Sequence, residues 1–217
     1  MKYELVVFDW DGTLLDSAGA IVLAIQAACR DLDLPVPDDD RARHVIGLGL
    51  IDAMRHAVPG LATERYPEVA DRYRHHYLSG DHQLTLFGGV REMLARLKVA
   101  GHILTIATGK SRHGLDRALA HSGLGSYFQA TRCADECHSK PNPQMLDELM
   151  AKFGIAPEAT LMIGDTSHDL QMAFNAGVDG VGVTYGAHPH DHLLDFHPVA
   201  CLHTVGELDQ IVGSLLQ

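Results

Sequence analysis

The stretch Leu5-Val6-Val7-Phe8-Asp9-Trp10-Asp11-Gly12-Thr13-Leu14 decides how this chain folds. Its apolar beginning has the length of a buried β-strand, and it ends abruptly in two aspartates followed by a turn-forming Gly-Thr pair. Two acids at the tip of a buried strand are unfavourable unless something compensates their charge. Mg²⁺ would do so, because it prefers oxygen ligands and leaves positions for phosphate oxygens and water. One carboxylate beside such an ion can act as nucleophile while the other shuttles protons, so we expect phosphoryl chemistry here.

The overall composition narrows the choice of partners. With 217 residues, of which 46% are hydrophobic, the chain can bury a large core in one or two domains. A formal net charge of −11 disfavours nucleic acid or an anionic membrane as main partner. A small anionic substrate stays possible, since a bound cation and local lysines can reverse the field at a site. The oligomeric state is left open.

Targeting signals are not evident in the sequence. The first apolar run breaks at Asp9, which is too early for a secretory signal, and no stretch approaches the roughly 20 apolar residues that cross a bilayer. The four cysteines are scattered rather than patterned. We therefore expect a soluble protein with reduced thiols in the cytoplasm.

From about residue 88 onward, strand and helix patterns alternate. Besides the first strand, we expect strands at 102–107, 127–130, 160–163 and 180–183. The helices between them begin at Val90, after an N-cap at Ser111, and at Asn142-Pro143, and a further helix ends at Ala176 before Gly177. This alternation predicts the α/β class, with a Rossmann-like parallel sheet covered by helices on both faces.

The segment after the first strand breaks that rhythm. Helical spacing recurs over about 21–32, 39–57 and 64–79, with no convincing strand among them. We therefore expect a small all-helical cap domain at 15–85, inserted into a catalytic core made of 1–14 and 86–217. The connections near 14–17 and 80–88 would serve as hinges.

Polar residues gather where the expected strands end. In an open parallel sheet the carboxyl ends of the strands meet in one crevice, where ligands bind. The candidates there are Asp9 and Asp11, Thr108-Gly109-Lys110, Lys140, and Asp165 with Asp169. Asp9 and Asp165 can ligate Mg²⁺. The Thr108 hydroxyl and the Gly109 amide can bind an anion at a helix N-terminus, and Lys140 can neutralise phosphate oxygens.

These motifs and their order resemble the haloacid dehalogenase superfamily, in the branch that includes phosphoglycolate phosphatase. Asp9-Trp10-Asp11-Gly12-Thr13 is similar to the first motif of that family, and Thr108 and Lys140 to the second and third. Gly164-Asp165 with Asp169 is similar to the fourth motif, and the helical insertion resembles the family's small helical cap. The resemblance covers nearly the whole chain.

The resemblance implies a role for each matching residue. Asp9 would attack phosphorus and form an aspartyl-phosphate, while Asp11 would protonate the leaving oxygen and later activate water. The Asp9 carboxylate, the Asp11 main-chain carbonyl and the Asp165 carboxylate would hold Mg²⁺. Asp169 would support the metal's water shell or orient Lys140. An acid at position 11 argues against a dehalogenase, because a halide leaves without a proton.

The expected reaction is hydrolysis of a small phosphate monoester, with phosphoglycolate favoured by the resemblance. Arg43 precedes the glycine-flanked loop 46–50 of the cap and could meet a carboxylate or second anion on the substrate. Two alternatives stay open: a phosphomutase of the β-phosphoglucomutase type, and a catalytically silent binding module. The complete set of clustered acids argues against the silent module.

Two further groups of metal-ligand residue types have a plainer interpretation. His188-Pro189-His190-Asp191-His192 follows the last clear strand, and we expect a solvated loop rather than a metal site. Cys133, Cys137 and His138 fit no common zinc spacing, so a structural or incidental role is expected.

Overall fold

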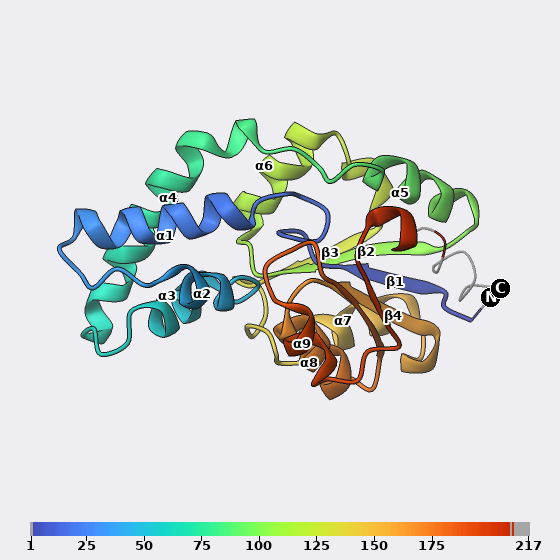
Figure 1. Cartoon of the computed structure of the whole chain (residues 1–217). Coiled ribbons are helices and arrows are strands. Elements are labelled where there is room, and N and C mark those ends of the chain that lie inside the picture. The colour runs from blue at the N-terminus through green and yellow to red at the C-terminus, as the bar shows by residue number, and fades with distance from the viewer. Residues whose placement is uncertain (1, 209, 211–217) are drawn as a thin grey trace.

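A parallel β-sheet with helices on both faces forms one lobe of the protein, and a bundle of helices forms the other (Figure 1). The computed structural model describes residues 2–208 and 210. Within them the strands are β1 (Leu5–Phe8), β2 (Ile103–Thr108), β3 (Ala130–Cys133), β4 (Thr160–Gly164), β5 (Asp179–Val183) and β6 (Ala200–Leu202). Their order is β3-β2-β1-β4-β5-β6, with all neighbours parallel. This is the strand order of a Rossmann-type sheet, so the expected fold class is confirmed.

The alternation of side chains along β1 explains how the sheet is covered. Successive residues of a strand point to opposite faces. Val6 and Phe8 therefore pack in one core cluster with residues of α5 (Val90–Val99) and α6 (Arg112–Ser122). Leu5 and Val7 pack in another cluster, with α7 (Gln144–Phe153) and α8 (Ser167–Asn175). Because β1 is buried on both sides, its sequence is uninterruptedly apolar.

Several expected boundaries are confirmed and others are wrong. Ser111 caps α6 through its side chain, which accepts a hydrogen bond from Gly114 N. The third strand is not at 127–130. A 3₁₀ turn ends at Tyr127, and β3 starts at Ala130, opposite Thr105. Tyr127 and Phe128 still pack on the core, which is why their apolar pattern resembled that of a strand. The strand β6 and the helix α9 (His190–Leu194) were not expected.

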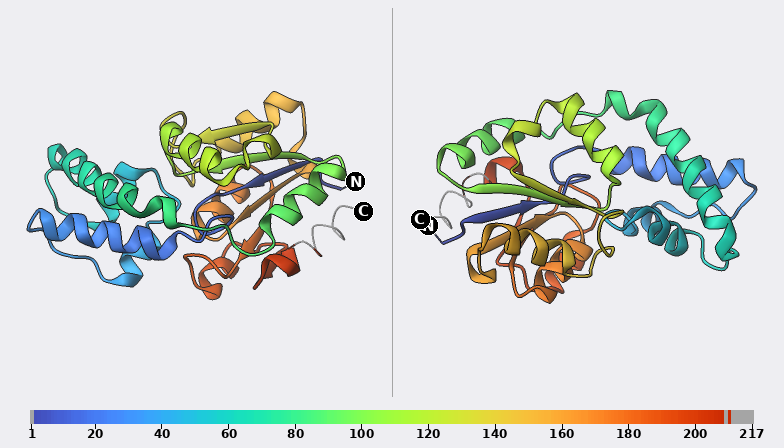
Figure 2. Two further views of the ribbon diagram at one scale, coloured as in Figure 1. Left: turned by 90° about the horizontal axis from the view of Figure 1, so that it is seen from above. Right: turned by 180° about the vertical axis from the view of Figure 1, so that it is seen from behind.

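The second lobe consists of helices from the segment after β1. They are α1 (Ala18–Asp31), α2 (Asp39–His44), α3 (Leu50–Ala57) and α4 (Tyr66–Gly80). The expected pattern over 39–57 is thus two helices, separated by a loop with Gly47 at a φ of 93°. These helices share a hydrophobic cluster of their own, and Figure 2 shows them as a lobe beyond the carboxyl ends of the strands. We call this lobe the cap.

The two chain segments that join the lobes pair with each other. Leu15 and Leu86 form an antiparallel bridge, and Asp16 N donates to Thr85 O at 3.0 Å. Phe87 N donates to Leu14 O at 3.1 Å. The expected hinges therefore lie side by side as a short ribbon. In the part of the chain that the structure describes, no helix is both long and apolar enough to cross a membrane.

Candidate active site

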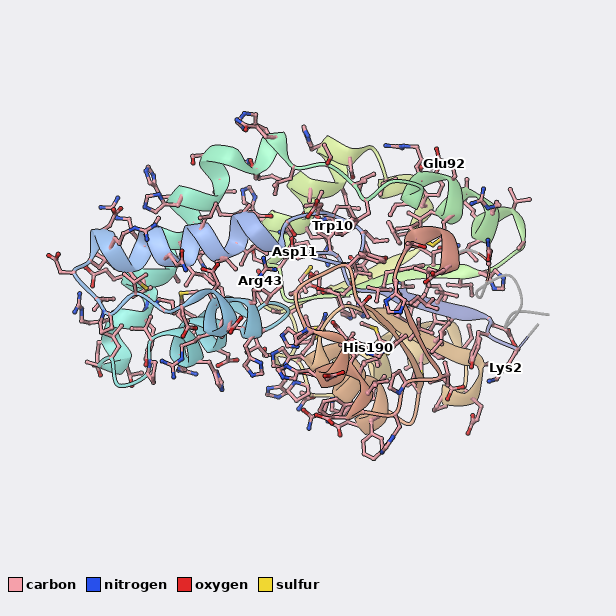
Figure 3. All side chains as sticks on the ribbon, in the orientation of Figure 1. Lys2, Trp10, Asp11, Arg43, Glu92 and His190 are labelled. Carbon is pink, nitrogen blue, oxygen red and sulfur yellow. The ribbon has the colours of Figure 1, made fainter. Side chains whose placement is uncertain are left out.

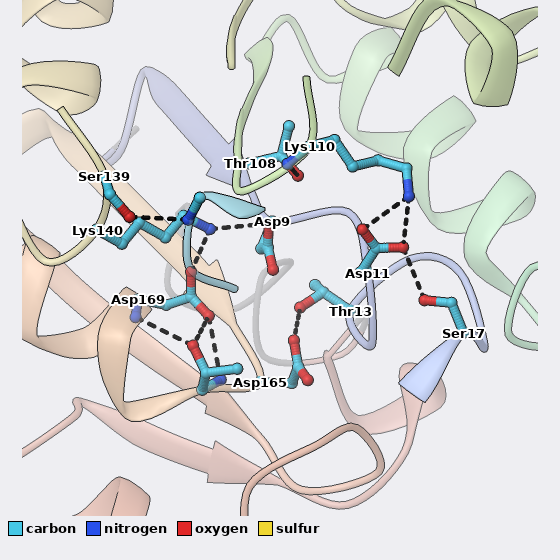
Figure 4. Close-up of polar contacts among 12 residues, drawn as sticks. Asp9, Asp11, Thr13, Ser17, Thr108, Lys110, Ser139, Lys140, Asp165 and Asp169 are labelled. Atoms are coloured by element: carbon cyan, nitrogen blue, oxygen red, sulfur yellow. Dashed lines mark hydrogen bonds and ion pairs between the residues drawn. The ribbon is translucent and has the colours of Figure 1, made fainter. Parts of the chain in front are cut away.

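Four charged residues from three segments of the chain converge where β1 and β4 end (Figure 4). Asp9 directly follows β1 and Asp165 directly follows β4. Asp169 lies in the first turn of α8, and Lys140 precedes α7. One oxygen from each of the three aspartates lies within 4.8 Å of the others, and all three residues are buried. β1 and β4 meet at the switch point of the sheet, so the fold places the expected residues together as predicted from strand ends.

Lys140 is the cation that compensates this acidic cluster from within the protein. Its side chain is fully buried, and Nζ lies 2.8 Å from Asp9 Oδ1 and 2.6 Å from Asp169 Oδ1. Burial by itself would lower the pKa of Lys140, but Asp169 and Asp9 outweigh that effect and raise it. The ammonium group therefore stays charged between the two carboxylates.

Asp9 retains unused capacity to bind a cation. Burial raises the pKa of Asp9 to about 7; Lys140 opposes this rise, and the negative charge of Asp169 adds to it. Apart from the Lys140 ion pair, neither Asp9 oxygen has a hydrogen-bond partner among the described residues. Buried polar atoms without partners are costly, and a divalent cation would satisfy them. The residues present thus fit a divalent metal such as Mg²⁺.

Asp165 is held on two sides. Thr13 donates its hydroxyl to Oδ1 at 2.7 Å, and Ala187 N donates to Oδ2 at 2.7 Å. Burial and the nearby charges of Asp9 and Asp169 raise its pKa well above the ordinary value. A Cβ atom at Gly12 or Gly186 would collide with the Asp165 carboxylate, so both positions require glycine.

Asp169 is engaged entirely by protein groups. Oδ1 accepts from Lys140, while Oδ2 accepts from Thr166 N at 3.1 Å and Thr166 Oγ1 at 2.6 Å. The bond from Thr166 N, together with the bond from Asp169 N to Thr166 Oγ1, forms a capping box at the start of α8. Of the two roles implied for this residue, orienting Lys140 agrees better with these contacts.

Asp11 points away from this cluster and pairs with Lys110. Nζ of Lys110 lies 2.9 Å from both Asp11 carboxylate oxygens, and Ser17 Oγ donates to Oδ1 at 2.8 Å. The Tyr77 hydroxyl, from α4 of the cap, accepts from Lys110 Nζ at 3.1 Å. Sequence reasoning named Lys110 only as part of the strand-end motif and gave it no role. Its position two residues after Thr108, in the same loop, was the available signal.

Gly109, next to Thr108, contacts the loop 45–49 between α2 and α3, which we call the cap loop. Thr108 ends β2, is buried, and accepts from Lys110 N at 3.2 Å. A Cβ atom at Gly109 would lie 2.5 Å from the carbonyl oxygens of Gly47 and Leu48. The cap loop therefore rests directly on Gly109. Above Asp9 and Asp11, between the cap and the core, lies a partly open cavity of about 1040 Å³.

Arg43 lies in α2 of the cap and is labelled in Figure 3. It does not line the cavity, although Val45, two residues later, does. The neighbouring His44 instead joins cap and core, because its carbonyl oxygen lies 2.7 Å from His168 Nε2 and 3.2 Å from His188 Nε2.

The expectation of a solvated loop at 188–192 is wrong for His188, which is buried, whereas residues 189–192 are exposed as expected, although most of them belong to a helix. His188 is 2% exposed and accepts at Nδ1 from Ser167 N at 3.0 Å. Its ring stacks on His44 at a centroid distance of 5.2 Å, and α9 follows from His190. Burial lowers the pKa of His188 to about 4, with His168 adding to the effect. The four cysteines are free thiols, and Cys133 is buried in the core.

Comparison with known proteins places this geometry in a family. The family model described as haloacid dehalogenase-like hydrolase matches residues 6–183. The chain belongs to this family. The predicted family is thus confirmed, and with it the prediction of a hydrolase of the phosphoric monoester type.

Individual relatives cover nearly the whole chain. It is 38% identical to the "Probable phosphatase IndB" of Dickeya dadantii, over 98% of this chain and 95% of that protein. It is 33% identical to the "Tyrosine-protein kinase PtkA" of Mycobacterium tuberculosis, over 97% of this chain and 72% of that protein. A "Phosphoglycolate phosphatase" of Aliivibrio fischeri is 31% identical over 90% of each.

A solved structure has the same fold. The crystal structure of a predicted phosphoglycolate phosphatase from Haemophilus somnus 129pt superposes with a TM-score of 0.86 at 26% identity, over 98% of this chain and 99% of that one. The resemblance to phosphoglycolate phosphatase-like proteins therefore holds at the level of both sequence and fold.

Proposed function

We propose that this protein is a Mg²⁺-dependent phosphatase that hydrolyses a phosphate monoester of a small metabolite through an aspartyl-phosphate on Asp9. One observation carries the proposal above all others. The Asp9 carboxylate is buried at the floor of a cavity, with Lys140 beside it and its oxygens otherwise without hydrogen-bond partners among the described residues. A carboxylate in that position is prepared for a cation and a phosphoryl group at once.

In the first step, an Asp9 oxygen attacks phosphorus as the bond from phosphorus to the alcohol oxygen breaks. Asp11, which also lines the cavity, gives its proton to the departing alcohol oxygen. In the second step, Asp11 takes a proton from water while the water oxygen attacks phosphorus, and the bond to Asp9 breaks. Lys140 stabilises the negative charge on the phosphoryl oxygens in both steps.

The metal would be held by Asp9 and Asp165, together with the Asp11 main-chain carbonyl. Mg²⁺ bound there neutralises negative charge on the carboxylates and on the phosphoryl oxygens. Asp169 fixes Lys140, and Thr108 and Gly109 complete the phosphate site. Arg43 does not line the cavity, so a direct role in substrate binding would require movement of the cap.

We further propose that residues 15–85 act as a cap domain on a core of 1–14 and 86–217. The cap would open for substrate entry and close to exclude water during the first step. Phosphoglycolate is the candidate suggested by the names of several relatives, and a cytoplasmic setting agrees with the four free thiols.

Transfer of the phosphoryl group to an acceptor other than water is the second candidate. A relative named as a tyrosine-protein kinase and a structural neighbour named as a β-phosphoglucomutase share this fold, the latter at only 20% identity. Either reaction would leave the phosphoryl group on an organic acceptor. A phosphatase instead releases inorganic phosphate in an amount equal to the substrate consumed.

The decisive experiment measures phosphate release from a panel of monoesters that includes phosphoglycolate, with Mg²⁺ and with chelator, for the wild type and for Asp9→Asn. We expect Mg²⁺-dependent release that vanishes in the variant. Substrate consumption without phosphate release would support transfer to another acceptor. Full activity of pure Asp9→Asn protein would contradict the assignment of the nucleophile.

A further inference from the structure

The cavity above Asp9 and Asp11 is far larger than a two-carbon acid requires. Its volume of about 1040 Å³ lies at the upper end of the roughly 300–1,000 Å³ that hold drug-sized ligands. Phosphoglycolate would occupy the floor and leave most of this space to water. The size of the cavity therefore bears on which alcohol the phosphate is attached to.

The cap contacts the core around this cavity, which is partly open to solvent. Gly49 N of the cap loop donates to Ser139 Oγ of the core at 2.8 Å. On the opposite side Arg117 of α6 pairs with Asp81 at 2.8 Å, at the end of the cap. The cap loop also rests on Gly109 in the middle. The cap therefore touches the core at three places, and the space between these contacts is still large.

The walls under the cap are mostly apolar. α1, α3 and the loop before α3 contribute the residues Ile21, Ile25, Val45, Ile46, Leu48, Leu50, Ile51 and Met54. Charged groups lie at the floor, as Asp9, Asp11 and Lys110, and along α6, and the cap itself adds Asp52 of α3 and Arg74 of α4. A ligand with its phosphate on Asp9 would thus place the rest of its body against hydrocarbon, which favours an apolar body.

An aromatic wall leads from the floor into this apolar space. Tyr73 and Tyr77 are stacked on α4, with ring centroids 5.7 Å apart and planes 18° from parallel, and both line the cavity. The Tyr77 hydroxyl lies 3.4 Å from Asp11 Oδ1, so Tyr77 is beside the residue that would protonate the leaving oxygen. Tyr73 lies one helical turn before Tyr77 in α4. Aromatic side chains that line a cavity favour contact with a planar ring.

We infer that the substrate is a phosphate monoester whose alcohol carries a planar, largely apolar ring, and that Tyr73 is a specificity-determining residue for it. The inference rests on the proposed function, because it places the phosphate on Asp9. It adds the chemical class of the leaving alcohol.

The test compares 3-phenylpropyl phosphate with propyl phosphate and phosphoglycolate in the presence of Mg²⁺. The first two esters have equivalent alkoxide leaving groups, so they differ only in the ring. We expect kcat/KM for the phenyl ester to exceed that for propyl phosphate and for phosphoglycolate by at least about tenfold. Equal values of kcat/KM, or a preference for phosphoglycolate, would overturn this inference but would still agree with the proposed phosphatase activity.

Tyr73→Leu tests the residue. We expect it to reduce the ratio of kcat/KM between the phenyl and propyl esters by at least about fivefold, through KM more than kcat. Tyr127→Leu is the matched control, because Tyr127 packs on the core away from the cavity, and its ratio should equal that of the wild type. Circular dichroism shows whether each variant is folded, and Tyr73→Phe, which keeps the ring, should retain the ratio. An unchanged ratio in folded Tyr73→Leu would contradict the assignment.

A binding measurement separates this inference from the proposed function. Titration calorimetry with 4-phenylbutylphosphonate and butylphosphonate, which are not hydrolysed, should give at least about tenfold tighter binding for the phenyl compound. If the protein shows such a difference in affinity but hydrolyses no ester, the result would support binding of the ring and contradict the proposed phosphatase activity. Equal affinities would overturn the ring site whatever the activity.

Discussion

The Lys110 ammonium group lies 2.9 Å from both carboxylate oxygens of Asp11 and thereby joins the loop after β2 to the loop after β1. Burial alone would lower the pKa of Lys110, but Asp11 and other nearby groups outweigh it and raise it. The side chain of Asp11 is thus fixed by a permanent cation, with Ser17 and Tyr77 completing its contacts. Lys110 is in this sense a positioning residue for the proposed acid and base.

Replacing Lys110 by Met should lower kcat by about 10- to 100-fold, because misplacing a proton-transfer group removes much of its contribution. KM should change less, and Lys110→Arg should recover part of the loss. Steady-state kinetics with p-nitrophenyl phosphate and an alkyl phosphate measure this, and Lys98→Met is the control, since Lys98 is exposed on α5. An unchanged kcat in Lys110→Met would contradict the positioning role.

Gly109→Ala should lower kcat/KM by about 10- to 100-fold, because the added methyl group would push the cap loop away from the core. Its Cβ would lie 2.5 Å from two backbone carbonyl oxygens, which cannot move without moving the loop. Gly19→Ala is the matched control, because a Cβ atom there meets nothing within 4 Å in α1. That control should keep full activity and gain up to about 1 kcal/mol of stability. Wild-type kinetics in Gly109→Ala would show that the loop contact is not needed.

Asp9 should make the metal-free protein less stable as the pH rises. Its pKa rises from the ordinary value of 3.8 to about 7 on folding, so between these values the folded state binds more protons than the unfolded state. The free energy of unfolding therefore falls as the pH rises through this window. Asp9→Asn removes the effect and should be more stable than the wild type at pH 8 by about 4 kcal/mol.

Urea unfolding in chelator, at several pH values between about 4 and 8, measures the difference between the two proteins. The difference between the two free energies of unfolding cancels the contributions of groups that titrate equally in both proteins. If the difference in free energy of unfolding does not grow with pH, ionised Asp9 does not destabilise the folded protein. A variant less stable than the wild type at the alkaline end of this range would lead to the same conclusion.

Addition of Mg²⁺ should raise the melting temperature of the wild type, because a ligand that binds only the folded state stabilises it. The gain is about 2.7 kcal/mol when the metal is present at about 100 times its Kd. Asp165→Asn should need at least about tenfold more Mg²⁺ for the same shift, since Asp165 is one of the three clustered acids. Asp147→Asn, an exposed acid on α7, should behave like the wild type. A Mg²⁺ response that survives intact in Asp165→Asn would place the metal elsewhere.

Much of the site could be predicted from the sequence because it depends on local pattern and on topology. Asp9 and Asp165 each follow an apolar run, and parallel strands bring their carboxyl ends to one edge of the sheet. This placement follows from strand order alone and does not depend on side-chain geometry. It holds for Thr108, which ends β2, in the same way.

The predictions from the sequence are wrong or incomplete where the local residue pattern is ambiguous or does not determine the structure. Tyr127 and Phe128 are apolar because they pack on the core from a turn, and the sequence does not distinguish this from a strand. β6 has three residues at the sheet edge, too few for a periodic pattern. His188 is buried because Ser167 and His44 surround it, and neither is near it in sequence.

The sequence by itself thus determined the α/β core, the helical insertion and the acids at the strand ends, because hydrophobic periodicity and chain order suffice for these. Only the tertiary structure decided what each charged group contacts. The pairing of Lys110 with Asp11, of Lys140 with Asp9 and Asp169, and the size of the cavity under the cap depend on distances between residues far apart in the chain. Such distances follow from how the cap packs on the sheet, which no local pattern encodes.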